Sequence, residues 1–143
     1  MPRPLRENEP MSDRTHAGDP LQAFHQFVVA INSQQVESLG ALMHSDHLFV
    51  DSQGNRVRGA ASMLAGWRGY FALCPDYRIR VERAIPEGDT VLAAGEAGGT
   101  IDGVSWSTPA AWMAVIRDGL VGEWRVFADN KPVYEILAKR GRS

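Results

Sequence analysis

A stretch of small residues, TVLAAGEAGGT at residues 90–100, decides how the rest of the chain can be arranged. It reads as a strand whose glycine and alanine residues carry little side-chain volume. Glycine lets a β-sheet bend, and small side chains fill less of the space on one side of it. Turn sequences border the stretch on both sides, PEGD at residues 86–89 and IDG at residues 101–103. The stretch therefore predicts a strand at which a sheet curves around a hollow.

Further strands lie on both sides of this stretch. Before it, Tyr77, Ile79 and Val81 alternate with charged residues, which indicates a strand with one face in water. After it, residues 106–116 and 120–129 predict two long strands, and RDG at residues 117–119 is a tight hairpin signal. These segments form an antiparallel meander. VYEILAKR, at residues 133–140, predicts a short terminal helix or strand.

Helical patterns occupy the first half of the chain. The pair Asp19-Pro20 starts a first helix, because Asp caps free N–H groups and Pro suits the first helical position. A second short helix follows over residues 36–43, and a short strand runs from roughly His47 to Asp51. A third helix begins after Gly59 and ends before Pro75. Helices followed by a meander predict an α+β fold, with three helices packed in a strongly curved antiparallel or mixed sheet.

Composition limits the classes of function. The chain has 143 residues and a formal net charge of -2, so no positive field draws it to nucleic acid or to a membrane surface. No apolar run approaches the roughly 20 residues that cross a bilayer. A single cysteine, Cys74, excludes a disulfide within the chain and favours a reducing, cytoplasmic location. We expect a disordered leader at residues 1–18, one domain at residues 19–137 and a tail at residues 138–143.

Several motifs in this order resemble one superfamily. They are FVDSQGNRVRG before the third helix, PDYRIRV after it, GDTVLAAGEA, and the closing RDGLVGEWRVFADN. Together they resemble the nuclear transport factor 2-like superfamily, which includes ketosteroid isomerases, limonene epoxide hydrolase and SnoaL-like polyketide cyclases. The resemblance implies a cystatin-like cone with a pocket for an apolar small molecule, without a cofactor. It also implies a homodimer through the convex face of the sheet.

Within the resemblance, Asp51 stands where ketosteroid isomerases carry their general base. The positions of the isomerase oxyanion donors hold Phe27 and Ala111, so both donors are missing. The functional positions of the epoxide hydrolase are occupied by Gly95, Ala97 and Val126, which lack its Arg and Asp groups. The resemblance therefore supports the fold more strongly than either reaction.

Asp51 has two interpretations. D-S-Q-G is good turn sequence, so the acid can bond its own backbone. Alternatively, it shares a face with Phe49 in an apolar pocket, where burial would raise its pKa and make it a base. Trp67 and Tyr70, on the third helix, are either core residues or pocket donors. His25 is either a boundary residue or a proton relay to Asp51.

The other candidates come from the strands and from the first two helices. Trp124, Val126 and Phe27 are expected to contact the ligand, whereas Trp112 is expected on the convex, dimer-forming face. Asp129 is expected at the rim or as a structural cap. His44 and His47 have a spacing of three but no third ligand nearby, so no metal site is expected. Trp106 has no assigned role.

Two functions remain open at this point. One is a cofactor-independent isomerase, cyclase or dehydratase in which Asp51 removes a proton beside a carbonyl. The other is a non-catalytic module of the same fold that binds a hydrophobic ligand or dimerises.

Overall fold

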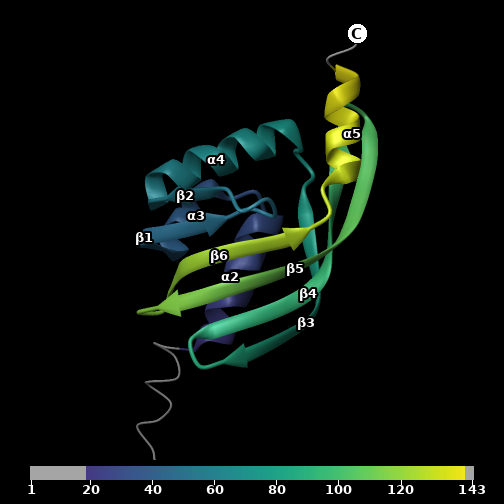
Figure 1. Ribbon diagram of the computed structural model, residues 1–143. Helices are drawn as coiled ribbons and strands as arrows, with labels where there is room; N and C mark the ends of the chain where they lie inside the picture. Colours follow the sequence, from purple (N-terminus) through teal and green to yellow (C-terminus); the bar gives the residue numbers. More distant parts are fainter. Residues whose placement is uncertain (1–18, 141–143) are drawn as a thin grey trace, which may run out of the picture.

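The computed structural model describes residues 19–140, so the expected leader lies outside the described residues. Figure 1 shows the arrangement of the helices and strands. In chain order they are α2 (Pro20–Asn32), α3 (Val36–Leu42), β1 (Met43–Val50), β2 (Arg56–Arg58), α4 (Ala60–Leu73), β3 (Arg78–Glu87), β4 (Thr90–Ile101), β5 (Val104–Arg117), β6 (Leu120–Ala128) and α5 (Lys131–Arg140).

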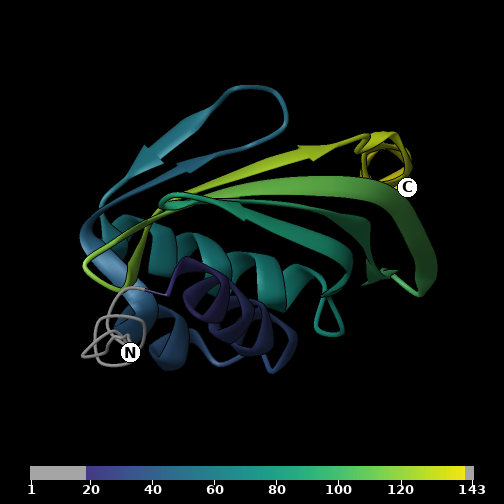
Figure 2. The same cartoon turned by 90° about the horizontal axis from the view of Figure 1, so that it is seen from below.

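The six strands form one mixed sheet in the order β2-β1-β6-β5-β4-β3. The pair β1–β6 is parallel, and the other neighbouring pairs are antiparallel. Figure 2 shows the sheet arching over α2, α3 and α4, which lie together beneath its concave face. The predicted α+β class, with helices packed in a curved sheet, is confirmed. No helix among the described residues is long and apolar enough to span a membrane.

The helix ends follow the sequence signals. The Asp19 carboxylate accepts hydrogen bonds from the backbone N–H groups of Leu21 and Gln22, at 3.1 and 3.4 Å, as an N-cap should. The helix that it starts, α2, buries one face that includes Phe24, Phe27 and Ile31. The helix α4 ends at Leu73, two residues before Pro75.

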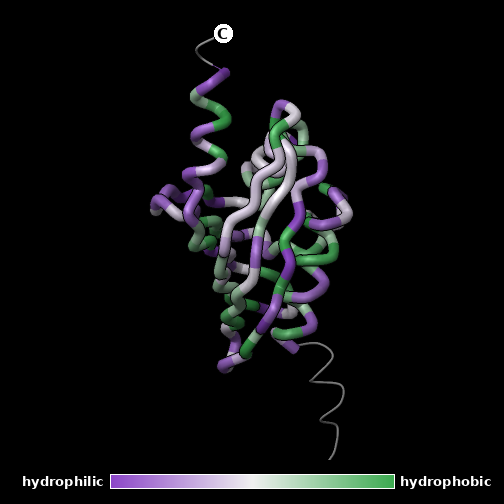
Figure 3. Tube along the Cα trace, turned by 90° about the vertical axis from the view of Figure 1, so that its right-hand side faces the viewer, coloured by the Kyte–Doolittle hydropathy of each residue, from purple (hydrophilic) through white to green (hydrophobic). Residues whose placement is uncertain are grey.

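The sheet curves where glycines allow strands to approach closely. A Cβ atom at residue 95 would overlap the backbone carbonyl oxygen of Arg80 and would lie 3.1 Å from the backbone nitrogen of Glu82. The register of β3 against β4 shifts at this place, between Val81 and Arg83. Such a bulge bends a strand and increases its twist. In Figure 3 much of the long hairpin is pale, because Gly, Ser and Thr have hydropathies near neutral.

Two tryptophans dominate the core on the concave side. Trp124 lies 4.8 Å from Phe27 and 5.5 Å from Phe24, measured between ring centroids. Trp112 is only 1% exposed and stands opposite Val126 in the pairing of β5 with β6, so it faces the same side as Trp124. The prediction that Trp112 lies on the convex face is therefore wrong.

Some element bounds also differ from those expected. The strand β1 begins at Met43 rather than near His47, and Met43 is a buried strand residue instead of part of the second helix. The terminal segment is helical as far as Arg140. Asp129 caps this helix, because its carboxylate accepts a hydrogen bond from the backbone N–H of Lys131 at 3.0 Å.

Candidate ligand pocket

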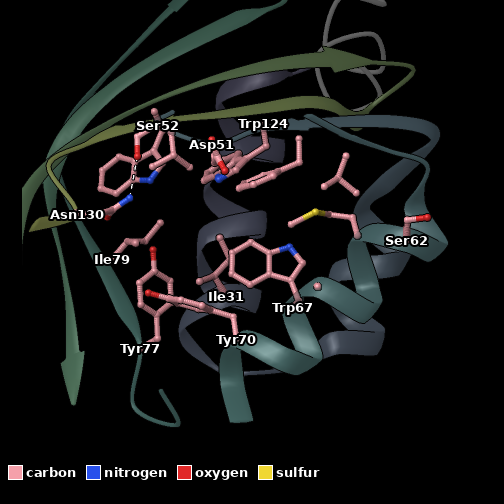
Figure 4. A pocket seen from close by; sticks show the side chains of 16 residues that line it. Ile31, Asp51, Ser52, Ser62, Trp67, Tyr70, Tyr77, Ile79, Trp124 and Asn130 are labelled. Carbon is pink, nitrogen blue, oxygen red and sulfur yellow. Dashed lines mark hydrogen bonds between the residues drawn. The ribbon is translucent and has the colours of Figure 1, made fainter. Parts of the chain in front are cut away.

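A cavity of about 350 Å³ lies between α4 and the concave face of the sheet. Figure 4 shows the side chains around it. Six of the residues predicted to form the site line this cavity: Phe49, Asp51, Trp67, Tyr70, Trp124 and Val126. The other lining residues are Ile31, Ser52, Val57, Ser62, Met63, Gly66, Tyr77, Ile79, Trp112 and Asn130. The walls are thus mainly aromatic and aliphatic, with a few polar groups.

Asp51 follows β1 directly and is held by its own loop. One carboxylate oxygen accepts hydrogen bonds from the backbone N–H groups of Gln53 and Asn55, both at 2.9 Å. The other oxygen accepts a hydrogen bond from the Asn55 side-chain amide at 3.1 Å. These are the bonds of a turn acid, and they fix the carboxylate where it meets the cavity.

The pKa of Asp51 follows from these contacts. Partial burial acts to raise it, but the hydrogen bonds from Asn55, Gln53 and Gly54 together outweigh burial and hold it below its ordinary value. Of the two interpretations of Asp51, these contacts match the turn acid, and its pKa is not raised as the alternative interpretation required. Because a lower pKa means a weaker base, Asp51 is an ionised carboxylate at neutral pH with little tendency to take up a proton.

Trp67 lines the cavity, and its side chain carries a polar group that has no protein partner. Its indole Nε1 is buried and makes no hydrogen bond, although indole N–H groups are normally paired when buried. Its ring lies 6.4 Å from that of Tyr77, between centroids. The rings of Tyr70 and Tyr77 meet at 85° with centroids 4.8 Å apart. Burial raises the pKa of both phenols, so both stay protonated.

Ser52 and Asn130 join two segments at the edge of the cavity. The Asn130 side-chain amide donates a hydrogen bond to the Ser52 hydroxyl at 2.7 Å, drawn as a dashed line in Figure 4. Ser52 lies in the loop after β1, and Asn130 lies between β6 and α5. The bond therefore connects the loop that carries Asp51 to the end of the meander.

Two residues predicted to contact the ligand are not among the lining residues. His25 is exposed on α2, with its ring edge-on to Phe24 at 5.4 Å between centroids, and it does not line the cavity that Asp51 borders. Phe27 is fully buried beneath Trp124, because it belongs to the packed face of α2. Ala111, aligned with an isomerase donor, faces the other side of the sheet, since it stands opposite Phe127.

The sequence reasoning missed Trp112, Tyr77, Ser52 and Asn130. Tyr77 is the apolar first residue of an alternating strand pattern, and this alternation is the signal in the sequence for its inward position. Ser52 follows Asp51 in the sequence, and Asn130 follows Asp129. No signal in the sequence indicates that Ser52 and Asn130 contact each other. Their contact spans 78 residues of chain.

His47 belongs to the core of the described structure. His47 is fully buried, and its Nδ1 donates a hydrogen bond to the Val121 carbonyl oxygen at 2.8 Å. Burial lowers the pKa of His47, and its Nε2 is left without a partner. Among the residues 19–140, no three His, Cys, Asp or Glu side chains gather in an arrangement that could hold a metal ion.

Solved structures share this architecture across most of the chain. A SnoaL-like polyketide cyclase homologue from Jannaschia sp. CCS1 matches with a TM-score of 0.74 at 18% identity, covering 91% of this chain and 95% of its own. An epoxide hydrolase from M. tuberculosis, similar to limonene epoxide hydrolase, matches with a TM-score of 0.73 at 16% identity, covering 82% and 83%.

A third similar structure comes from Catenulispora acidiphila DSM 44928. It is a hypothetical protein with a ketosteroid isomerase-like fold, in complex with trimethylamine, with a TM-score of 0.69 at 19% identity, covering 74% of this chain and 84% of its own. These identities establish the fold alone. The search of curated proteins found no significant match. The sequence model of the SnoaL-like domain matches residues 24–124, which is most of the chain, and the protein therefore belongs to the SnoaL-like domain family.

Proposed function

We propose that this protein binds one small, largely apolar molecule in the cavity between α4 and the sheet. The observation that carries the proposal is the cavity itself, about 350 Å³ in volume and walled by aromatic side chains. Ligand sites in proteins are typically concave and mostly apolar, with volumes of roughly 300–1,000 Å³ and a few polar groups that orient the ligand. Asp51, Trp67 and Asn130 supply such groups here.

Proton transfer to Asp51 is a second candidate function. It is favoured by one observation, the unpartnered indole N–H of Trp67, a residue that lines the same cavity as Asp51. A carbon acid beside a carbonyl would give its proton to Asp51, and the resulting enolate oxygen would accept a hydrogen bond from Trp67. This step would be common to the isomerase, cyclase and dehydratase reactions considered for Asp51. The lowered pKa of Asp51 limits its strength as a base, so we rank binding first.

The experiment is a binding survey followed by one substitution. Trp67, Trp112 and Trp124 line the cavity, so ligand entry should change the tryptophan fluorescence. A panel of neutral cyclic ketones and small amines is titrated into the protein. Amines are included because the Catenulispora protein was solved with trimethylamine. If no compound binds at millimolar concentration, the binding proposal is refuted.

Asp51→Asn then separates binding from catalysis. The matched control is Asp89→Asn, which changes an exposed acid that does not line the cavity. A catalytic Asp51 predicts that Asp51→Asn abolishes turnover of a bound ketone while its affinity is kept. Unchanged turnover in Asp51→Asn would refute the role of Asp51 as the base.

We also propose that two copies of the chain pair through the convex face of the sheet. On that face Ile85, Leu92 and Phe127 are each more than half exposed. They stand in neighbouring rows of the register, Ile85 opposite Leu92 and Phe127 opposite Ala111, so they form one apolar surface. Burying such a surface favours association. Sedimentation at micromolar concentration should give a dimer, and Phe127→Asp should give a monomer. A monomeric wild type would refute the pairing.

A further inference from the structure

We infer that the cavity selects an organic ammonium cation with small apolar substituents over a neutral molecule of the same shape. The inference rests on the proposed binding function and names the class of ligand for the same cavity. Three features of the described lining residues carry it: their charge, their aromatic rings and the fixed position of the carboxylate.

The only formal charge among the described lining residues of the cavity is negative. Asp51 is the one acidic side chain among the described lining residues, and no Lys, Arg or His is among them. An anionic ligand would therefore meet a carboxylate without any compensating cation. A neutral ligand would leave the carboxylate without an ionic partner. A cation is the one class of ligand that gains from this charge.

The aromatic rings give the cation a second source of attraction. Six lining residues are aromatic: Phe49, Trp67, Tyr70, Tyr77, Trp112 and Trp124. The negative face of an aromatic ring attracts an ammonium group within about 6 Å of its centroid, most strongly for tryptophan. Because Tyr70 and Tyr77 meet at 85°, their surfaces point in different directions and form a corner rather than a single stack.

The carboxylate lies across the cavity from this corner. In Figure 4 the rings of Trp67, Tyr70 and Tyr77 lie on one side, and Asp51 and Trp124 lie on the other. The hydrogen bonds from Gln53 and Asn55 hold Asp51 in place before a ligand arrives. A preorganised charge need not be reoriented on binding, which favours affinity. The methyl groups of the cation would contact the rings, and its charge would face Asp51.

The test compares choline with 3,3-dimethylbutan-1-ol, which has the same shape but carries a carbon in place of the charged nitrogen. Each is titrated into the full chain by isothermal calorimetry and by tryptophan fluorescence. We expect choline to bind at least about 10-fold more tightly than the alcohol, in line with cation–π and ion-pair attraction in a partly desolvated site. Choline has no titrating group at the nitrogen, so its affinity should hold between pH 8 and pH 6.

Matched variants identify the source of the preference. Asp51→Asn should weaken choline about 10-fold and leave the alcohol unchanged, whereas Asp89→Asn should alter neither. Tyr70→Phe keeps an aromatic ring and should retain the preference for choline, while Tyr70→Leu should reduce it. Thermal unfolding of each variant shows whether the fold is intact, and Asp51→Asn carries the test if Tyr70→Leu fails to fold.

Each outcome has one meaning. Equal affinities, or tighter binding of the alcohol, would overturn the cation preference while leaving the binding proposal in place. A choline preference that survives Asp51→Asn would overturn the role of the carboxylate. Absence of binding by both probes would overturn the inference, and the panel of ketones and amines would then decide the binding proposal separately.

Discussion

The curvature of the sheet makes a sharp prediction at Gly95. Changing Gly95 to Ala adds a methyl group that would overlap the Arg80 carbonyl oxygen and lie 2.9 Å from the Arg80 carbonyl carbon. Both atoms belong to the backbone of β3, so no side-chain rotation relieves the overlap. The strand β3 would have to move away from β4, and overpacking of this kind destabilises proteins by about 1–3 kcal/mol. We expect a loss near the upper end of that range.

Gly69→Ala is the matched control for this prediction. Gly69 lies inside α4, is exposed, and has no atom within 4 Å of an added Cβ. Alanine in a helix interior is favoured over glycine by about 0.5–1 kcal/mol, so this variant should be more stable than wild type. The same substitution is thus expected to change the free energy of unfolding in opposite directions at the two positions.

The assay is urea and thermal unfolding followed by tryptophan fluorescence. The two variants should differ by about 3 kcal/mol in the free energy of unfolding, which corresponds to roughly 10 °C in Tm for a chain of this size. If Gly95→Ala is as stable as wild type while Gly69→Ala behaves as expected, β3 and β4 do not require glycine at this contact. The explanation of the bent sheet would then be wrong.

Three further predictions concern buried polar contacts. Burial lowers the pKa of His47, so the stability that its neutral form contributes should be fully present above about pH 6.5 and should be lost as the pH falls below that value. In His47→Leu, the free energy of unfolding in urea should therefore change less between about pH 7.5 and pH 5.5 than in the wild type. Asn32→Ala should lower the free energy of unfolding by about 2 kcal/mol, because its side chain bonds both the N–H and the carbonyl oxygen of buried Ile79 at 2.8 and 3.0 Å; a loss below about 0.5 kcal/mol would contradict this in a denaturant titration. Asn130→Ala and Ser52→Ala should each cost about 1 kcal/mol, and a double-mutant cycle should show that the two losses are not additive.

The helices and the meander were predictable because their signals are local. Asp19 and Pro20 start α2, and Pro75 follows the end of α4, as the propensities of these residues imply. The turns at Asp102-Gly103 and Asp118-Gly119 adopt positive φ, which the IDG and RDG sequences indicate. Six residues of the cavity were likewise predicted, because the resemblance to known folds fixed the order of the elements.

The position of Trp112 was not predictable from its own strand, because β5 is apolar on both faces. A regular two-residue hairpin at Asp118-Gly119 would place Trp112 opposite Arg125, on the convex side. Instead the register shifts between Val115 and Ile116, so that Trp112 stands opposite Val126 and faces the helices. Arg117 donates a hydrogen bond to the Gly122 carbonyl oxygen at 3.2 Å within this irregularity. A single extra residue therefore reverses the side that a strand presents.

The sequence by itself determined the kinds of element, their order, and six of the residues that line the cavity. Only the tertiary structure decided the sheet order, the parallel pairing of β1 with β6, and the state of the Asp51 carboxylate. Helix caps and turn residues act over a few residues of chain, so they can be recognised directly in the sequence. Strand register and the contact of Asn130 with Ser52 join residues far apart in the chain, and these depend on how all the elements pack together.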